Sequence, residues 1–342
     1  MLELAIVGIV LVFGVVVLIP IFQTVAKIYP YSYPNARVRS LKSKLVTKNE
    51  FEDLLTKPYN EIIYYLEKKH YTNLSKFLDL DFSFASLEVA IRSDLINTVG
   101  KLISISPSPI KEFLIVYAKR FDIQVIEALV RSLNRKFRIS RDILHVTKTF
   151  SKDFIYKDNH SIEDIENELK QTGFRKFIDK YKDQLRNNKF TQFEVDLDLF
   201  YYNKLIHAAS SRNQKRFVKR LIDLRNISSF VKGIKPNIAG GKILLDKLDL
   251  GVDLLKVLKN SGYKIKFNGE DNSNYLDKIE RELQLCLLKF ANDLLKNEPL
   301  SDASILGFLL LKIINSRNLI ILLKMKSHDI ESSKIREVLA IW

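Results

Sequence analysis

An uncharged stretch near the amino terminus limits how this chain can fold. Between Glu3 and Lys27 lie 23 residues without a charged side chain, and 15 of the 19 residues from Leu4 to Phe22 are Leu, Ile, Val or Phe. As a helix, this stretch would be roughly 34 Å long, enough to cross the ~30 Å hydrocarbon core of a bilayer. It carries no polar stripe, which argues against a helix buried in a soluble protein. The sequence therefore predicts a membrane span over residues 4–26.

The charges on either side of this stretch predict its orientation. Only Glu3 and the terminal amine precede it, whereas five basic residues follow closely: Lys27, Arg37, Arg39, Lys42 and Lys44. Positively charged flanks stay in the cytoplasm. A cleaved signal peptide would start with a positive segment and end at small residues, and neither pattern occurs here. We therefore expect a single-pass protein of the cell membrane, with the amino terminus outside and the rest of the chain on the cytoplasmic face.

The remainder of the chain has the pattern of helices. It contains only 11 Gly and 8 Pro in 342 residues, whereas an all-β chain of this size needs many turns rich in both. Apolar residues recur at helical spacing, and no convincing alternating strand appears. Capping boxes at Thr47–Glu50 and Ser161–Asp164 indicate two helix starts. A third start is expected at Pro34, after a stiff connector over Tyr29–Pro34. The sequence predicts an all-α fold.

Three segments share one pattern, in which an Asp or Asn precedes an apolar helix that ends on Lys or Arg. They are Arg120–Arg131, led by Asp122; Leu221–Lys232, led by Asp223; and Ile314–Lys324, led by Asn315. We interpret the leading polar residues as helix N-caps. They are 101 and 92 positions apart, which suits three related helical modules of about 100 residues each. The predicted division is an anchor over residues 1–28 and modules over 29–138, 139–236 and 237–342.

No arrangement of catalytic, cofactor-binding or metal-binding residues emerges. The five His are scattered, and the single Cys286 lies in an apolar run, so we expect neither a metal site nor a disulfide framework. The segment Gly240–Ile243 resembles a phosphate loop but lacks its first Gly and its Ser or Thr. Asp196 and Asp198 alternate near a predicted helix start, where solvated carboxylates are common. We expect no enzyme activity and no cofactor.

The formal net charge of +15 does not by itself identify a partner. From Lys152 to Lys189 the basic residues alternate with Asp and Glu, as on the solvated faces of helices. A nucleic-acid binder would need a clustered basic stripe. We therefore expect no nucleic-acid partner.

Several motifs resemble one family. Tyr33-Pro-Asn35-Ala-Arg37-Val-Arg39, followed by Phe51–Leu55, looks like the opening of the C subunit of V/A-type ATPases and ATP synthases, which corresponds to the eukaryotic d subunit. The Asp- or Asn-led helices look like that family's repeated element. Its best matches pair Asp223 with Asn226 and Asn315 with Asn318, and the Gly pair Gly240-Gly241 fits the start of the third module. The resemblance covers about residues 29–340.

The resemblance implies a function that composition and spacing do not. The family fold is three similar helical domains around a pseudo-threefold axis, which together form a funnel. Members are non-catalytic rotor subunits that join the central stalk to the proteolipid ring. They transmit torque between ATP chemistry and proton or sodium flow. Expected partners are therefore central-stalk subunits, the proteolipid ring, other rotary ATPase subunits, and the membrane through residues 4–26.

The chain departs from the family pattern in two places. Val125 stands where the other repeats carry Asn, and a membrane-like amino terminus is not general among members. A span outside the ring would be dragged through lipid past the stator, so residues 4–26 are expected to lie in the ring's central opening. The roles of Arg37 and Arg39 stay open between a subunit interface and either a salt-bridged helix face or phospholipid contact near the membrane. The alternative function is a membrane-anchored helical adaptor that recruits a cytoplasmic partner.

Overall fold

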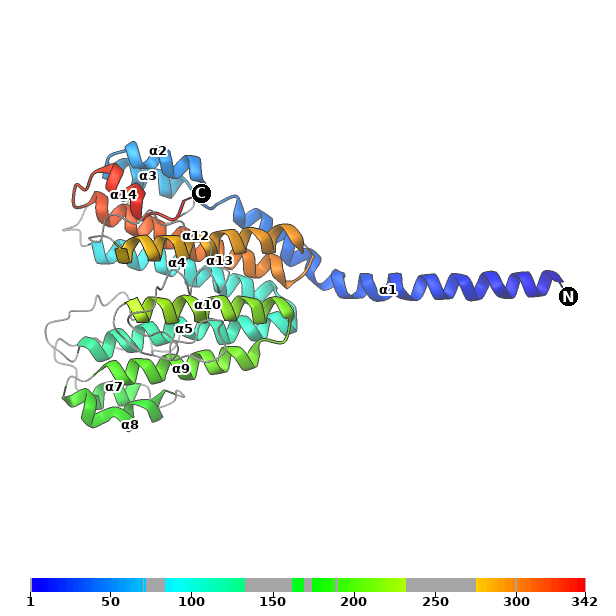
Figure 1. The fold of residues 1–342 in the computed structure, drawn as a ribbon, viewed down its shortest axis with the longest axis horizontal. Coiled ribbons are helices and arrows are strands. Elements are labelled where there is room, and N and C mark those ends of the chain that lie inside the picture. Colours follow the sequence, from blue (N-terminus) through cyan, green and yellow to red (C-terminus); the bar gives the residue numbers. More distant parts are fainter. Residues whose placement is uncertain are drawn as a thin grey trace.

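The structure of the chain is a computed structural model. It describes residues 2–69, 71, 84–132, 162–168, 174–187, 190–231, 275–298 and 300–341. Across these residues every regular element is a helix, so the predicted all-α class is confirmed. The helices form one elongated body, and the first of them projects from one end (Figure 1).

The helix bounds show which sequence signals are correct. The described helices are α1 (Leu2–Lys42), α2 (Lys48–Thr56), α3 (Tyr59–Lys68), α4 (Phe84–Ile105), α5 (Ser108–Ser132), α7 (Ile162–Glu168), α8 (Arg175–Arg186), α9 (Thr191–Ala208), α10 (Arg212–Val231), α12 (Tyr275–Asn297), α13 (Asp302–Lys326) and α14 (Ser332–Val338). The predicted capping box begins α2: the Glu50 amide donates to Thr47 Oγ1, and the Thr47 amide donates to the Glu50 carboxylate at 2.7 Å. Ser161 lies outside the described residues.

Helix α1 corrects two predictions about the amino-terminal region. Tyr29–Pro34 is not a connector, and Pro34 does not start a helix, because α1 runs unbroken from Leu2 to Lys42 with Pro20, Pro30 and Pro34 inside it. Each proline removes one backbone donor and favours a bend, but the helix continues when its neighbours keep their bonds. Thr24 Oγ1 donates to the Pro20 carbonyl at 2.7 Å. Helix α1 changes direction where it meets the body (Figure 1).

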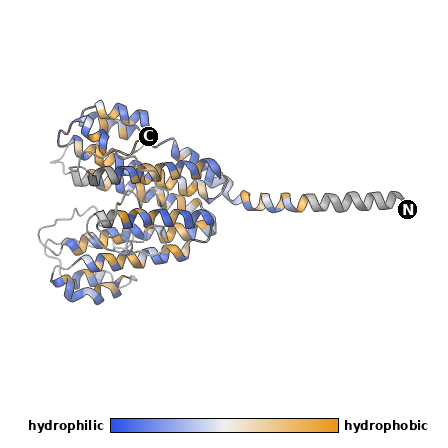
Figure 2. Cartoon of the chain, in the orientation of Figure 1, coloured by the Kyte–Doolittle hydropathy of each residue, from blue (hydrophilic) through white to orange (hydrophobic). Residues whose placement is uncertain are grey.

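The described side chains divide α1 into two parts. Leu18, Ile19, Ile21, Phe22 and Val25 are each at least half exposed, and Phe22 reaches 70%. No other described segment lies beside this apolar part (Figure 2). Further along α1, Asn35 and Val38 are buried, because here the helix packs against α13 and α4. The outer part of α1 thus presents an apolar surface that the body leaves uncovered.

Three long helical hairpins make up most of the body. They pair α4 with α5, α9 with α10, and α12 with α13. Their turns fall at Ser106-Pro107, at Ala209–Ser211 and between Asn297 and Asp302. Ser301 caps α13, its Oγ accepting from the Ala303 amide at 3.1 Å. All three turns lie at the end of the body from which α1 projects (Figure 1).

Helix α13 holds the body together. It contacts α1, α3, α4, α10, α12 and α14. Of the helices whose side chains the structure describes, only α13 is long and apolar enough to cross a membrane. However, 78% of its most apolar stretch is buried inside the protein. That burial is expected of a central core helix. The amino-terminal half of α13 joins a large apolar core with α4, α5, α9 and α10, and its other half joins a smaller core with α2, α3 and α14.

Candidate partner-binding cavity

A cavity of about 650 Å³ opens between α4, α5, α12 and α13. Its volume is in the range of pockets that hold ligands or partner side chains. Much of its wall is apolar: Val89, Leu95, Ile96, Phe121, Val125, Ala128, Ile313, Ile320 and Ile321. Such a wall, open to the outside, can receive apolar side chains of another protein.

Charged and polar groups occupy the rest of the cavity wall. Arg92 donates through Nε to Glu88 at 2.8 Å, and Arg317 Nη2 lies 3.1 Å from a Glu280 oxygen. Ser316 Oγ and Arg317 Nη1 are buried with no hydrogen-bond partner in the described protein. A buried polar atom without a hydrogen bond costs free energy. Binding of a hydrogen-bond acceptor, from water or from a partner protein, would therefore be favourable at these two atoms.

Arg120 links the cavity to a buried network of charges. It lines the cavity and pairs with Asp198 of α9, while Arg225 of α10 donates through Nε to the other Asp198 oxygen at 2.7 Å. Glu127 lies 3.9 Å from Arg120. Burial acts to lower the pKa of Arg120, but its neighbours Asp198, Tyr202, Glu127 and Tyr201 together outweigh burial and raise that pKa. Burial likewise raises the pKa of Glu127.

The prediction of a solvated carboxylate at Asp198 is therefore wrong. Asp198 is 1% exposed and bridges three helices. The predicted alternation with Asp196 is correct, since Asp196 faces α8 and accepts hydrogen bonds from Tyr181 and Lys180. The sequence shows no local sign of burial, because the two arginines that surround Asp198 lie 78 and 27 positions away.

The repeated Asp and Asn residues are not helix N-caps. Asp122, Asp223 and Asn315 all lie in the interiors of α5, α10 and α13, several turns after each helix begins. The apolar periodicity extends upstream of each, so the polar residue interrupts a helix instead of starting it. Asp223 and Asn226 are fully buried, each with a partner inside the protein. In each repeat the second helix of a hairpin thus carries a polar group at mid-length.

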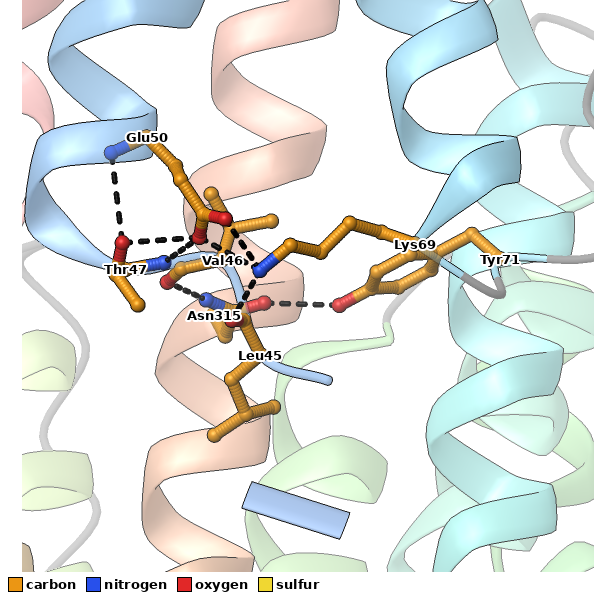
Figure 3. Close-up of polar contacts among 7 residues, drawn as sticks. All are labelled: Leu45, Val46, Thr47, Glu50, Lys69, Tyr71 and Asn315. Atoms are coloured by element: carbon orange, nitrogen blue, oxygen red, sulfur yellow. Dashed lines mark hydrogen bonds and ion pairs between the residues drawn. The ribbon is translucent and has the colours of Figure 1, made fainter. Parts of the chain in front are cut away.

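Asn315 and Asn318 tie α13 to distant backbone. Figure 3 shows Asn315 between two segments: its Oδ1 accepts from Tyr71 at 2.8 Å, and its Nδ2 donates to the Val46 carbonyl at 2.8 Å. Asn318 exchanges two hydrogen bonds with the Ala340 backbone, at 2.9 and 3.2 Å. Both amides also border a second, smaller cavity of about 190 Å³. These contacts are structural, so the two motif residues fasten segments near both ends of the chain to α13.

Glu50 beside this site carries a pH-dependent contribution to stability. Burial acts to raise its pKa, but four hydrogen bonds together lower the pKa to about 2. The donors are Lys69, at 2.7 Å (Figure 3), the Thr47 amide, Tyr65 and Thr47 Oγ1. A carboxylate with a lowered pKa stabilises the fold above its unfolded pKa. That stabilisation is lost as the pH falls from about 4.5 to about 2.

The Glu50→Gln variant should therefore be less stable by about 1 kcal/mol at pH 7, because its side chain is 28% exposed and solvent screens the Lys69 pair. Urea unfolding between pH 7 and pH 2 would measure this, and the difference from wild type should vanish near pH 2. Asp53→Asn on the same helix is the control. Its exposed pair with Lys57 contributes less than about 0.5 kcal/mol. A Glu50→Gln deficit that stays constant with pH would contradict the assignment.

The remaining motif residues divide between surface, interior and undescribed chain. Tyr33 is 66% exposed, and Arg37 and Arg39 point outward on α1 without an ion pair to a described residue. Asn35 is buried, and neither polar atom of its side chain has a described partner. Gly240 and Gly241 lie outside the described residues.

Sequence reasoning did not find the cavity residues or the buried Lys312. Lys312 pairs with Asp94 of α4 and lies over the Tyr71 ring at 4.4 Å. Burial lowers its pKa despite the charge of Asp94. A lone Lys in the apolar run Phe308–Ile314 was a usable signal, since an isolated charge there needs a partner. Arg120 and Arg317 offered no comparable signal, because the helices that surround them are far apart in sequence.

Comparisons with known proteins cover nearly the whole body. Residues 34–338 match the family described as ATP synthase (C/AC39) subunit. A protein of Pyrococcus horikoshii, named as the C subunit of an A-type ATP synthase, is 26% identical over 343 residues, with 93% of this chain and 92% of the relative aligned. One of the same name from Methanosarcina acetivorans is 24% identical, with 91% of this chain and 93% of the relative aligned.

Proposed function

Because the chain belongs to the ATP synthase (C/AC39) subunit family and is thus an accessory subunit of a rotary ATP synthase, we propose that it is the rotor subunit that couples the central stalk to the proteolipid ring. In this role it transmits torque for proton- or sodium-coupled ATP synthesis or hydrolysis and catalyses no step itself. Its partners are the central-stalk subunits and the ring. The observation that carries the proposal is the partly apolar cavity between two of the three long hairpins.

The hairpin arrangement supports the cavity as the seat of the stalk. Three hairpins with a polar residue at mid-length of the second helix are consistent with three related modules around an axis. The cavity lies between two of them, lined by α4 and α5 on one side and by α12 and α13 on the other. A helical stalk end could insert apolar side chains there and pair with Arg317 or Ser316.

The apolar part of α1 supports attachment to the membrane. Its described side chains are exposed on all sides, which is unfavourable in water and favourable in lipid. Tyr29 and Tyr33 follow at the level expected of a water–lipid boundary. We propose one span with the amino terminus outside, set in the ring's central opening so that it can turn with the rotor.

A photocrosslinker at Phe22 would then capture inner ring helices, and capture of outer helices would contradict this placement.

Filling the cavity should separate stalk binding from ring binding. Gln124 and Ala128 line the cavity one turn apart on α5, so Gln124→Trp/Ala128→Trp should reduce recovery of central-stalk subunits at least about tenfold. Ring proteolipids should be recovered as with wild type. The measurement is affinity capture of the chain from detergent-extracted membranes, with quantification of the proteins retained.

The matched control is Ile115→Trp, which adds the same ring to an exposed position on α5 outside the cavity and should leave stalk recovery unchanged. Undiminished stalk recovery with the filled cavity would exclude the cavity as the stalk's seat. If neither stalk nor ring subunits are captured with the wild-type chain, the result would contradict the rotor role and favour the alternative function of a membrane-anchored adaptor.

A further inference from the structure

The first half of α10 carries a one-sided stripe of positive charge. Arg212, Lys215, Arg216 and Lys219 are exposed, and Arg220 is half-buried beside them. Their spacing places them on one face of the helix, opposite the buried Phe217 and Val218. No acidic residue occurs between Arg212 and Ile222. The alternation of charges noted between Lys152 and Lys189 does not occur on this helix face, which we call the α10 basic stripe.

The α10 basic stripe is unfavourable for the helix that carries it. Cations at a helix amino terminus oppose the macrodipole, and like charges spaced by three or four residues repel. Arg212, Lys215 and Lys219 form no salt bridge with any described residue. Arg216 and Arg220 pack over the Phe290 ring, at 5.4 and 5.8 Å, which orders their side chains. An arrangement that opposes the local preference is most readily explained by a ligand of opposite charge.

The start of the stripe lies beside the root of α1. Ser211 Oγ and Asn213 Nδ2 both donate to the carboxylate of Asp302, the latter at 3.1 Å. Tyr31 of α1 is near the same carboxylate: burial, and secondarily the charge of Asp302, raises the pKa of this tyrosine. Tyr31 also packs against the large core. Arg212 lies between Ser211 and Asn213 in sequence, so the stripe begins near the part of α1 that also carries the exposed Tyr29 and Tyr33.

We propose that the α10 basic stripe binds anionic phospholipid headgroups that surround α1 at the mouth of the ring's central opening. The inference rests on the proposed span of α1. From Arg212 to Lys219 the helix rises about 10 Å, so the stripe stays within about one Debye length of a surface at the level of Arg212. Headgroup phosphates fit a mixed row of Lys and Arg, since they are mobile acceptors that need no fixed geometry. An acidic protein loop is the competing occupant.

The test uses the full chain in two kinds of lipid nanodisc, one of phosphatidylcholine alone and one containing about one-third phosphatidylglycerol. Brief acetylation followed by mass spectrometry measures how accessible each lysine is. Lys215 and Lys219 should react at least about threefold more slowly in the anionic discs at physiological salt. That protection should disappear in about 1 M salt, where the Debye length is about 3 Å. Exposed lysines far from α1, namely Lys176, Lys324 and Lys334, are the internal control and should react equally in both.

A variant separates lipid binding from folding. Arg212→Glu places an acid at the first residue of α10, which suits the macrodipole, so the melting temperature should not fall. The protection of Lys215 and Lys219 in anionic discs should nevertheless fall by about half, because one of the four exposed cations is reversed. A parallel loss of melting temperature and protection would instead mean that the stripe acts only through folding.

The outcomes distinguish this inference from the proposed function. Insertion into both kinds of disc with equal lysine reactivity would overturn the lipid assignment, favour an acidic protein loop, and leave the span intact. Failure of the chain to associate with either kind of disc would overturn the span and the lipid assignment together. Protection only in anionic discs, reversed by salt, supports both.

Discussion

Replacing Asp198 with alanine is expected to destabilise the protein by about 3–5 kcal/mol. Asp198 is 1% exposed and is the shared partner of Arg120 and Arg225, which come from two other helices. Its removal leaves two arginines crowded in a partly buried site with Glu127 as the remaining acid near Arg120. The loss would consume much of the roughly 5–15 kcal/mol that typically separates folded from unfolded domains.

Urea unfolding followed by circular dichroism would measure this effect, and the melting temperature should fall with it. Asp183→Ala is the matched control, because the Asp183 side chain is 94% exposed and lies 3.9 Å from Arg186; it should change stability by less than about 0.5 kcal/mol. If Asp198→Ala costs under about 1 kcal/mol, water must reach both arginines in solution, and the network is not buried as described.

The second large effect concerns two glycines that should respond in opposite directions. A methyl group on Gly307 of α13 would lie 2.7 Å from the Ala291 carbonyl oxygen and 2.9 Å from Leu295 Cγ. Gly307→Ala should therefore separate α12 from α13 and cost about 1–3 kcal/mol, even though alanine favours the helix itself. Only a side chain as small as hydrogen allows the two helices to approach so closely.

Gly100 in the middle of α4 provides the comparison. A methyl group there would meet no atom within 4 Å, so Gly100→Ala should stabilise the protein by about 0.5–1 kcal/mol through helix propensity alone. Thermal unfolding of both variants would check the pair. Stabilisation by Gly307→Ala would show that α12 and α13 pack less closely than the structure has them.

Local features of the fold were predictable from the sequence, because the residues that determine them lie close together. Thr47 and Glu50 form the predicted capping box that begins α2. The all-α class followed from few glycines and helical spacing. The family resemblance is confirmed by the match over residues 34–338. The three module boundaries and the funnel stay predictions.

Features that depend on distant contacts were missed or misread. Asn315 looked like a helix start because a polar residue preceded an apolar run, yet its partners are Tyr71 and Val46, near the other end of the chain. Asp198 looked solvated because its neutralising arginines are on other helices. Pro34 looked like a first helical residue because a proline suits that position, but α1 begins at Leu2 and continues through Pro34. The α10 basic stripe was overlooked because the charges were judged over the whole chain.

The smaller core has a consequence for the order of events during synthesis. It joins α2 and α3 to the end of α13 and to α14, and the Tyr71–Asn315 hydrogen bond spans 244 positions. At about 5–20 residues per second, a ribosome needs roughly 12–50 s to make the chain between these two partners. Throughout that interval α2 and α3 have been translated but lack the helices that cover them. A nascent chain whose first segment is already in the membrane would thus be tethered there long before its body closes, so premature termination near the carboxyl terminus should leave an anchored, exposed species for chaperones or proteases.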